Sequence, residues 1–146
     1  MKVVVFAPSG AVASALDQLP LGDGDDVLVV AGGPPDTVAG VRTVILTPSL
    51  RAATRWAGAA LGGSVAGRNL LRLTPLDPGR RFAGATRRAG RLRTELAEAD
   101  LIVALERDGI LAAWHAARRA GAHAHAVYGV PAAQGRMAEG RAAHAD

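Results

Sequence analysis

The stretch Ala99 to Trp114 reads ADLIVALERDGILAAW and decides the fold class of this chain. Its apolar run, Leu101 to Leu105, is typical of a strand that is buried in a parallel sheet. A polar turn, Glu106 to Gly109, follows this run, and a helical pattern then extends to about Ala120. Ligands of open α/β sheets usually bind at such turns, because these lie at the carboxyl ends of the strands. The segment therefore indicates an α/β fold and a place to look for function.

Four further apolar runs have the length and composition of strands. They are 2–7 (KVVVFA), 27–31 (VLVVA), 43–46 (TVIL) and 124–130 (AHAVYGV). Strands that alternate with helices indicate a single Rossmann-like α/β domain with a mostly parallel sheet. Right-handed crossovers then predict about five strands in the order 3-2-1-4-5, with helices on both faces. The strands that end at Ala7 and Leu105 are neighbours in this order, so a ligand site is expected between their exits.

The direction of the third strand is left open by the sequence. Only the residues from Gly32 to Arg42 separate it from the second strand. A parallel crossover normally needs a dozen or more residues, so this link holds at most one helical turn. The strand is therefore either antiparallel or reached through an irregular loop.

Short helical patterns are expected to follow the first and third strands. Ser9 is predicted to cap the first helix and Ser49 the second, which extends to Leu61. The apolar run Leu70 to Leu73 is either a helix end or a small extra strand. Gly121 is predicted to end the helix that begins after Glu106 to Gly109.

A long amphipathic helix is expected from Asp77 to Ala99, because Asp77-Pro78 is a start signal and apolar residues recur at spacings of three and four. Its other face is rich in arginine. Such a face is usually only solvated; otherwise it binds an acidic protein or a membrane surface. Nucleic acid is not expected, because interleaved aromatic residues and a known motif are both missing. The candidate partner-binding residues are Arg80, Arg87, Arg88 and Arg91.

The composition bounds the class of protein. The chain has 146 residues, of which 49% are hydrophobic and only 3% aromatic, so small side chains must fill the core. The absence of cysteine excludes disulfides, thiolate metal sites and cysteine nucleophiles. The net charge of +4 permits an anionic partner without requiring one. No apolar run reaches the roughly 20 residues of a membrane span, and a cytoplasmic protein is expected. We expect the domain over 1–131, and a short helix or flexible tail over 132–146.

The first turn, Ala7 to Ala13, is one candidate site. It contains one glycine, whereas a dinucleotide fingerprint has three, and no Walker A pattern occurs in the chain. The backbone N–H groups of Gly10 and Ala11, beside Ser9, are nevertheless placed to bind an anion at a helix start. The alternative is an ordinary turn that Ser9 caps.

The turn after the fourth strand is the stronger candidate. Glu106 can accept hydrogen bonds from ligand hydroxyls or act as a base, and Arg107 can bind a phosphate or carboxylate. The alternative is that Asp108 caps the next helix while Glu106 and Arg107 are only solvated. The residues expected to bind a ligand are therefore Ser9, Gly10, Ala11, Glu106, Arg107 and Asp108.

Two other features favour structural roles. His123 and His125 share one strand face and could join Glu106 around a metal, but two histidines are weak evidence, so no metal site is predicted. Trp114 is expected to pack in the core. No cofactor is assigned.

The arrangement resembles the N-terminal half of a GT-B type glycosyltransferase. The resemblance rests on three stretches, KVVVFAPSGAVASAL at the start, GRNLLRLTPLDPGRRF ending at Phe82, and ADLIVALERDGILAAWHAARR from Ala99. In that family a second domain faces the first and holds the sugar nucleotide. The acidic-glycine donor motifs of that second half are missing here. The resemblance therefore implies an acceptor-side module that acts with a partner chain or a second copy.

Three functions remain open at this stage. The first is this half-site module, which would need a second domain for glycosyl transfer. The second is a small enzyme or sensor that binds a nucleotide or another phosphorylated ligand at Gly10 and Arg107. The third is an interaction protein that uses the arginine-rich helix face.

Overall fold

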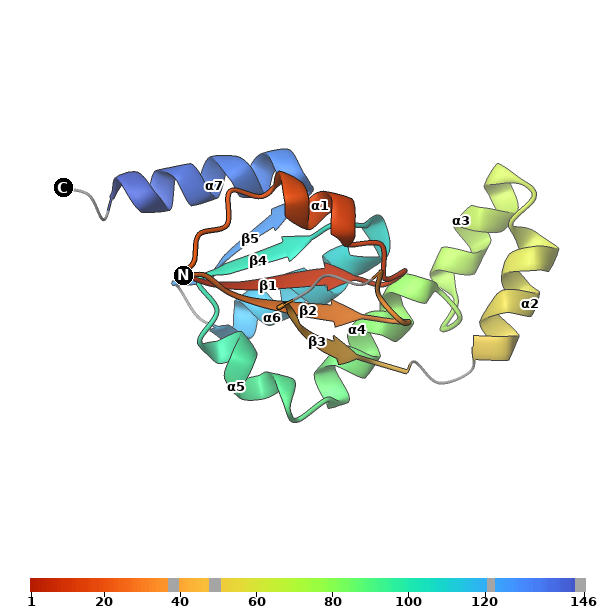
Figure 1. Cartoon of the computed structure of the whole chain (residues 1–146). Coiled ribbons are helices and arrows are strands. Elements are labelled where there is room, and N and C mark those ends of the chain that lie inside the picture. The colour runs from red at the N-terminus through yellow and green to blue at the C-terminus, as the bar shows by residue number, and fades with distance from the viewer. Residues whose placement is uncertain (37–39, 48–50, 121–122, 144–146) are drawn as a thin grey trace.

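Five parallel strands form one sheet in the order β3-β2-β1-β4-β5 (Figure 1). The structure, a computed structural model, describes residues 1–36, 40–47, 51–120 and 123–143. The predicted α/β class and strand order are confirmed. The strands are β1 (Lys2–Ala7), β2 (Asp26–Ala31), β3 (Arg42–Ile45), β4 (Leu101–Ala104) and β5 (His125–Tyr128).

The third strand is parallel to its neighbour. Its register pairs Leu28 with Arg42 and Ala31 with Ile45, so the antiparallel alternative is excluded. The described residues of the link, on either side of 37–39, are not helical. An irregular loop can therefore carry the chain back to the amino edge in fewer residues than a helical crossover needs.

Helices cover both faces of the sheet, as predicted. The side chains of Val4 and Phe6 lie in one core layer, and those of Val3 and Val5 lie in the other. This alternation follows from the two-residue period of a strand. The first layer is covered by α4 (Pro78–Arg88), α5 (Leu92–Ala97) and α6 (Ile110–Ala120), and the second by α1 (Ala13–Gln18) and α7 (Val130–Ala142).

Two helices, α2 (Arg51–Leu61) and α3 (Val65–Leu73), form a hairpin outside these layers, on the side to which the strands point (Figure 1). They pack closely at Gly67, where an added Cβ would lie 2.1 Å from the carbonyl oxygen of Leu61. Ser64 caps α3 by accepting the N–H of Gly67 at 2.9 Å. The run Leu70 to Leu73 is thus the end of a helix. The predicted cap Ser49 and the predicted helix end Gly121 lie outside the described residues.

The single long helix predicted from Asp77 to Ala99 is wrong. Asp77 does cap α4, accepting the N–H of Arg80 at 3.2 Å, but α4 ends at Arg88 and a separate helix, α5, begins at Leu92. The break falls at Ala89 and Gly90, where glycine weakens a helix. Turning here lets α5 reach the amino edge of the sheet. There Glu95 pairs with Lys2 at 2.8 Å and with Arg42 at 3.0 Å.

The C-terminal part of the described chain is the helix α7, which has 13 residues. Gly129 turns the chain from β5 into this helix with a φ of +80°, a conformation that glycine adopts without strain. Ala133 and Met137 are fully buried in the core layer that α7 shares with α1. Among the described helices, none is long and apolar enough to cross a membrane.

Candidate functional site

The carboxyl ends of β1 and β4 lie side by side, as the predicted strand order requires. Phe6 pairs with Ala104, and the turns that follow these strands therefore adjoin. They approach closely at Gly109, where an added Cβ would lie 3.1 Å from the carbonyl oxygen of Phe6. This point, where the connections leave the sheet in opposite directions, is the usual ligand position in a doubly wound fold.

Glu106 joins the two turns. One of its carboxylate oxygens accepts the N–H of Ser9 at 3.1 Å, and the other accepts the Ser9 hydroxyl. The same hydroxyl oxygen accepts the N–H of Ala11 at 3.1 Å. The prediction that Ser9 caps α1 is therefore wrong, because its side chain is turned toward Glu106. Glu106 is also more than a solvated side chain, since it holds the first turn against the second.

The N-terminus of α1 is capped by a residue from the next loop. One carboxylate oxygen of Asp36 accepts the N–H groups of Val12 at 2.7 Å and Ala13 at 3.1 Å. The carbonyl of Gly10 in turn accepts the N–H of Asp36 at 3.1 Å. A carboxylate of the protein thus engages the N–H groups at the helix start. The two N–H groups predicted to bind an anion are engaged elsewhere, that of Gly10 by the carbonyl of Ala7 at 3.0 Å and that of Ala11 by the Ser9 hydroxyl. A ligand phosphate would have to displace Asp36 or Glu106 to reach the N–H groups that donate to these carboxylates.

Gly10 is needed in this turn for two reasons. Its φ is +93°, and an added Cβ would lie 2.6 Å from the carbonyl oxygen of Pro34. Any other residue would be both strained and in collision with backbone. The loop after β2 is therefore packed directly onto the turn after β1.

Asp108 lies half-buried beside the start of α4. Burial raises the pKa of its carboxyl above the ordinary value, and the negative charges of Asp77 and Glu106 raise it further. The backbone at Gly79 fits against it, since an added Cβ there would lie 3.3 Å from the carbonyl oxygen of Asp108. The three carboxylates make this side of the sheet edge acidic.

Arg107 is the exposed cation of the turn. Within the described part of the chain its guanidinium makes no hydrogen bond or ion pair, so it remains available to an anionic ligand. Its positive charge lowers the pKa of Asp108 and so offsets part of the increase caused by Asp77 and Glu106. Of the residues predicted to bind a ligand, Arg107 therefore offers an exposed cationic group that no described residue pairs with.

The first two turns of α6 expose large apolar side chains next to this edge. Trp114 is 49% exposed, which corrects the prediction that it packs in the core, and Ile110 and Leu111 are exposed beside it. The guanidinium carbon of Arg118 lies 4.7 Å from the centre of the Trp114 ring. The positions that face the sheet are instead alanines. They are Ala112, Ala113, Ala116 and Ala120. The sequence carries this signal, since alanines occupy the positions of the helix that face the sheet and Trp114 lies on its other side.

The arginine-rich surface is divided between two helices. Arg80, Arg87 and Arg88 are exposed on α4, whereas Arg91 lies beyond the break and donates a hydrogen bond to the carbonyl of Ile45 at 3.0 Å. The charge continues onto α6. There burial, followed by the charges of Arg87, Arg119 and Arg118, lowers the pKa of His115.

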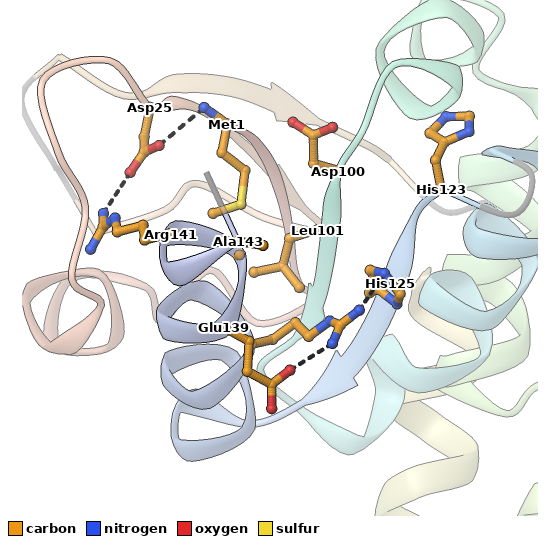
Figure 2. A pocket seen from close by; sticks show the side chains of 11 residues that line it. Met1, Asp25, Asp100, Leu101, His123, His125, Glu139, Arg141 and Ala143 are labelled. Atoms are coloured by element: carbon orange, nitrogen blue, oxygen red, sulfur yellow. Dashed lines mark hydrogen bonds and ion pairs between the residues drawn. The ribbon is translucent and has the colours of Figure 1, made fainter. Parts of the chain in front are cut away.

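The two histidines lie at the opposite, amino edge of the sheet (Figure 2). They line an open hollow of about 830 Å³ between the strands and α7. His123 bonds to the carbonyl of Ala97 at 3.1 Å, and His125 contacts Arg136. Glu106 is at the other edge, so it cannot join them around a metal. No group of three possible metal ligands occurs among the residues that the structure describes. Figure 2 shows Asp25 paired with both the Met1 amino group and Arg141 at this edge.

Comparisons with protein-family models, with curated proteins and with solved structures find no significant match to this chain. The fold and the geometry of the sheet edge therefore carry the functional argument.

Replacing Ser9 by alanine tests the link between the two turns. Ser9→Ala removes a hydroxyl that bonds to Glu106 and accepts the N–H of Ala11. We expect a loss of about 1 kcal/mol in the free energy of unfolding, since the bond involves a charged group but is exposed to water. Urea denaturation measures the loss. The control is Ser14→Ala, an exposed serine on α1, and an equal loss in both variants would contradict the link.

Asp108→Asn tests the burial of that carboxyl. Because the folded pKa is raised, the ionised carboxylate opposes folding, and wild-type stability gains from protonation as the pH falls through the folded pKa. The asparagine variant should therefore be more stable than wild type at pH 7, and the difference should disappear below the ordinary aspartate pKa. Thermal unfolding from pH 3 to pH 8 measures this. A stability difference that is the same at pH 3 and pH 8 would contradict the burial of this carboxyl.

Proposed function

We propose that this chain is a Rossmann-like binding module that forms one wall of a ligand site and acts with a second polypeptide, which supplies the other wall. The observation that carries the proposal is the surface next to the carboxyl ends of β1 and β4. No residue that the structure describes pairs with Arg107 there, and large apolar side chains at the start of α6 are exposed. Exposed apolar residues that adjoin polar groups at a sheet edge are typical of a surface that a partner covers.

The resemblance to the N-terminal half of GT-B type glycosyltransferases gives the proposal its chemical class. In that family the second domain holds a sugar nucleotide, and the first contributes the acceptor side. This chain would then be the acceptor-side half, placed in the cytoplasm, and the second polypeptide would be a chain that binds a nucleotide sugar. A second copy of this chain is the other possible source of the missing wall.

The geometry of the first turn supports a divided site. Its N–H groups donate to Glu106, to the Ser9 hydroxyl and to Asp36. The donors on this half are therefore already engaged and are not open to a nucleoside diphosphate. If the partner binds the diphosphate and Arg107 of this chain faces it, none of these hydrogen bonds has to break.

Trp114→Ala tests partner binding through α6. Buried aromatic anchors typically cost about 2 kcal/mol or more when truncated to alanine, which is a loss of roughly thirtyfold in affinity. We expect this loss for a candidate partner that carries a nucleotide-sugar-binding half, measured by isothermal titration calorimetry. The matched control is Trp56→Ala on α2, which should bind the partner as tightly as wild type.

The same proteins are assayed for sugar transfer. The isolated chain should not turn over UDP-glucose or GDP-mannose, whereas the complex should. Turnover by the chain alone, or equal partner affinity of both alanine variants, would refute the proposal. Light scattering of the isolated chain shows whether a second copy is the partner.

A second candidate function is supported by Arg107 itself. Its exposed, unpaired guanidinium fits a phosphorylated small ligand that binds without any partner. Arg107→Ala should then weaken binding of such a ligand by roughly 1.5–3 kcal/mol, the range for a hydrogen bond to a charged group. Titration with a panel of nucleotides and sugar phosphates measures it. Arg87→Glu with Arg91→Glu is the control, since these residues lie away from the turn, and unchanged affinity in Arg107→Ala would exclude this function.

A further inference from the structure

The α2–α3 hairpin is weakly attached to the rest of the domain. Ala57 is buried between the helices, and Leu61 and Leu71 are partly buried. Apart from packing against each other, the two helices make only sparse contacts with the other described elements. The hairpin therefore projects beyond the carboxyl edge of the sheet (Figure 1).

The outer surface of this hairpin is apolar. Trp56 is 75% exposed and Leu73 is 77% exposed, and Leu70 and Val65 are exposed with them. Ala66, Leu70 and Leu73 recur at the spacing that places residues on one face of a helix. Large side chains left in water at such levels cost free energy, so the surface favours an apolar environment.

The charged residues of the hairpin itself have one sign. Residues 37–76 contain no aspartate, glutamate, lysine or histidine, but they contain five arginines. Arg55 precedes Trp56 in α2 and Arg72 precedes Leu73 in α3, and both arginines are exposed. Arg72 is also close enough to Asp108 to lower the pKa of that carboxyl. Arginine can keep its charged end in an aqueous interface while its stem lies along apolar surface.

We propose that the α2–α3 hairpin binds the surface of an anionic lipid bilayer. Tryptophan and leucine on the apolar side, with arginine as the charged residue, are the features of helices that lie in a membrane interface. Anionic headgroups attract each nearby arginine, and the acyl region accepts the apolar side chains. This surface differs from the α6 surface of the proposed function, so a negative result for one proposal leaves the other unaffected.

The size of the hairpin favours a bilayer over an acidic protein. A stable protein–protein interface takes about 20–30 residues from each partner. Every residue from 51 to 73 would have to take part to reach that number, but one side of each helix packs against the other helix. A bilayer needs no complementary shape, so a few inserted side chains with flanking arginines suffice.

Vesicle binding tests the proposal. The chain should bind vesicles of phosphatidylcholine with about a third phosphatidylglycerol, bind pure phosphatidylcholine much less, and dissociate when the salt concentration shortens the screening length. Arg55→Gln with Arg72→Gln should weaken binding to the anionic vesicles about thirtyfold, since each arginine contributes about 1 kcal/mol near such a surface. Arg118→Gln with Arg119→Gln removes the same charge from α6 and should change binding little.

The two tryptophans report where the contact is made. Trp114→Phe leaves Trp56 as the sole tryptophan, and its fluorescence should shift to the blue when anionic vesicles are added. Trp56→Phe leaves Trp114, and its fluorescence should stay unchanged. Combined Trp56→Ser, Leu70→Ser and Leu73→Ser should weaken vesicle binding more than tenfold, and circular dichroism should show the fold retained, because all three side chains are exposed.

Three results would overturn the proposal. The first is no binding of wild type to anionic vesicles, and the second is a blue shift from Trp114 in place of Trp56. The third is binding to soluble polyglutamate as tight as to vesicles and equally strong in the triple serine variant, which would assign the hairpin to an acidic protein. Self-association that the serine variant abolishes, with no vesicle binding, would assign it to a second copy of the chain.

Discussion

Alanine on the inner side of α6 is the constraint that the rest of the molecule follows. With methyl groups facing the strands, the helix lies close to the sheet, and Phe6 and Phe82 fill the remaining space edge to face at 6.1 Å. Ile110, Leu111 and Trp114 lie on the other side of α6 and are exposed, which costs free energy unless something covers them. The same helix therefore gives small side chains to the core and large apolar ones to the surface.

A second constraint acts at the edge of the sheet. The turns after β1 and β4 adjoin because the strands pair, but the bonds from Glu106 to Ser9 fix their relative position. The same bonds use the donors that a Rossmann-like fold usually offers to phosphate. The edge is therefore ordered before any ligand arrives, but it is ordered around the protein's own carboxylates. This favours a ligand that the chain contacts with Arg107 over one that it encloses.

Local patterns predicted the sheet well and the helices less well. The central strands β1, β2 and β4 are buried on both faces and carry continuous apolar runs, so they could be predicted from the sequence. The edge strands β3 and β5 are mostly exposed, but their short apolar runs were sufficient to place them in the order. The break between α4 and α5 could not be predicted, because the apolar spacing continues through Gly90 and one glycine does not by itself end a helix. The contacts of Glu95 with Lys2 and Arg42, which follow from the turn, join residues far apart in the sequence. The cap of α1 was missed for a related reason. Asp36 lies 24 residues away from Val12 in sequence, and only the fold brings it there.

The carboxyl edge of the sheet is acidic, whereas the α2–α3 hairpin is basic, and this difference favours one orientation of the molecule at an anionic surface. The sheet edge holds Asp77, Glu106 and Asp108, and the pKa of Asp108 is raised by burial first and then by the negative charges of the other two. The hairpin that projects from the same side has no acid at all. An anionic surface is therefore attracted to the hairpin and repelled by the edge, within a screening length of about 8 Å. Contact through the hairpin would leave the edge and the outer face of α6 in water, where a second polypeptide can still reach them.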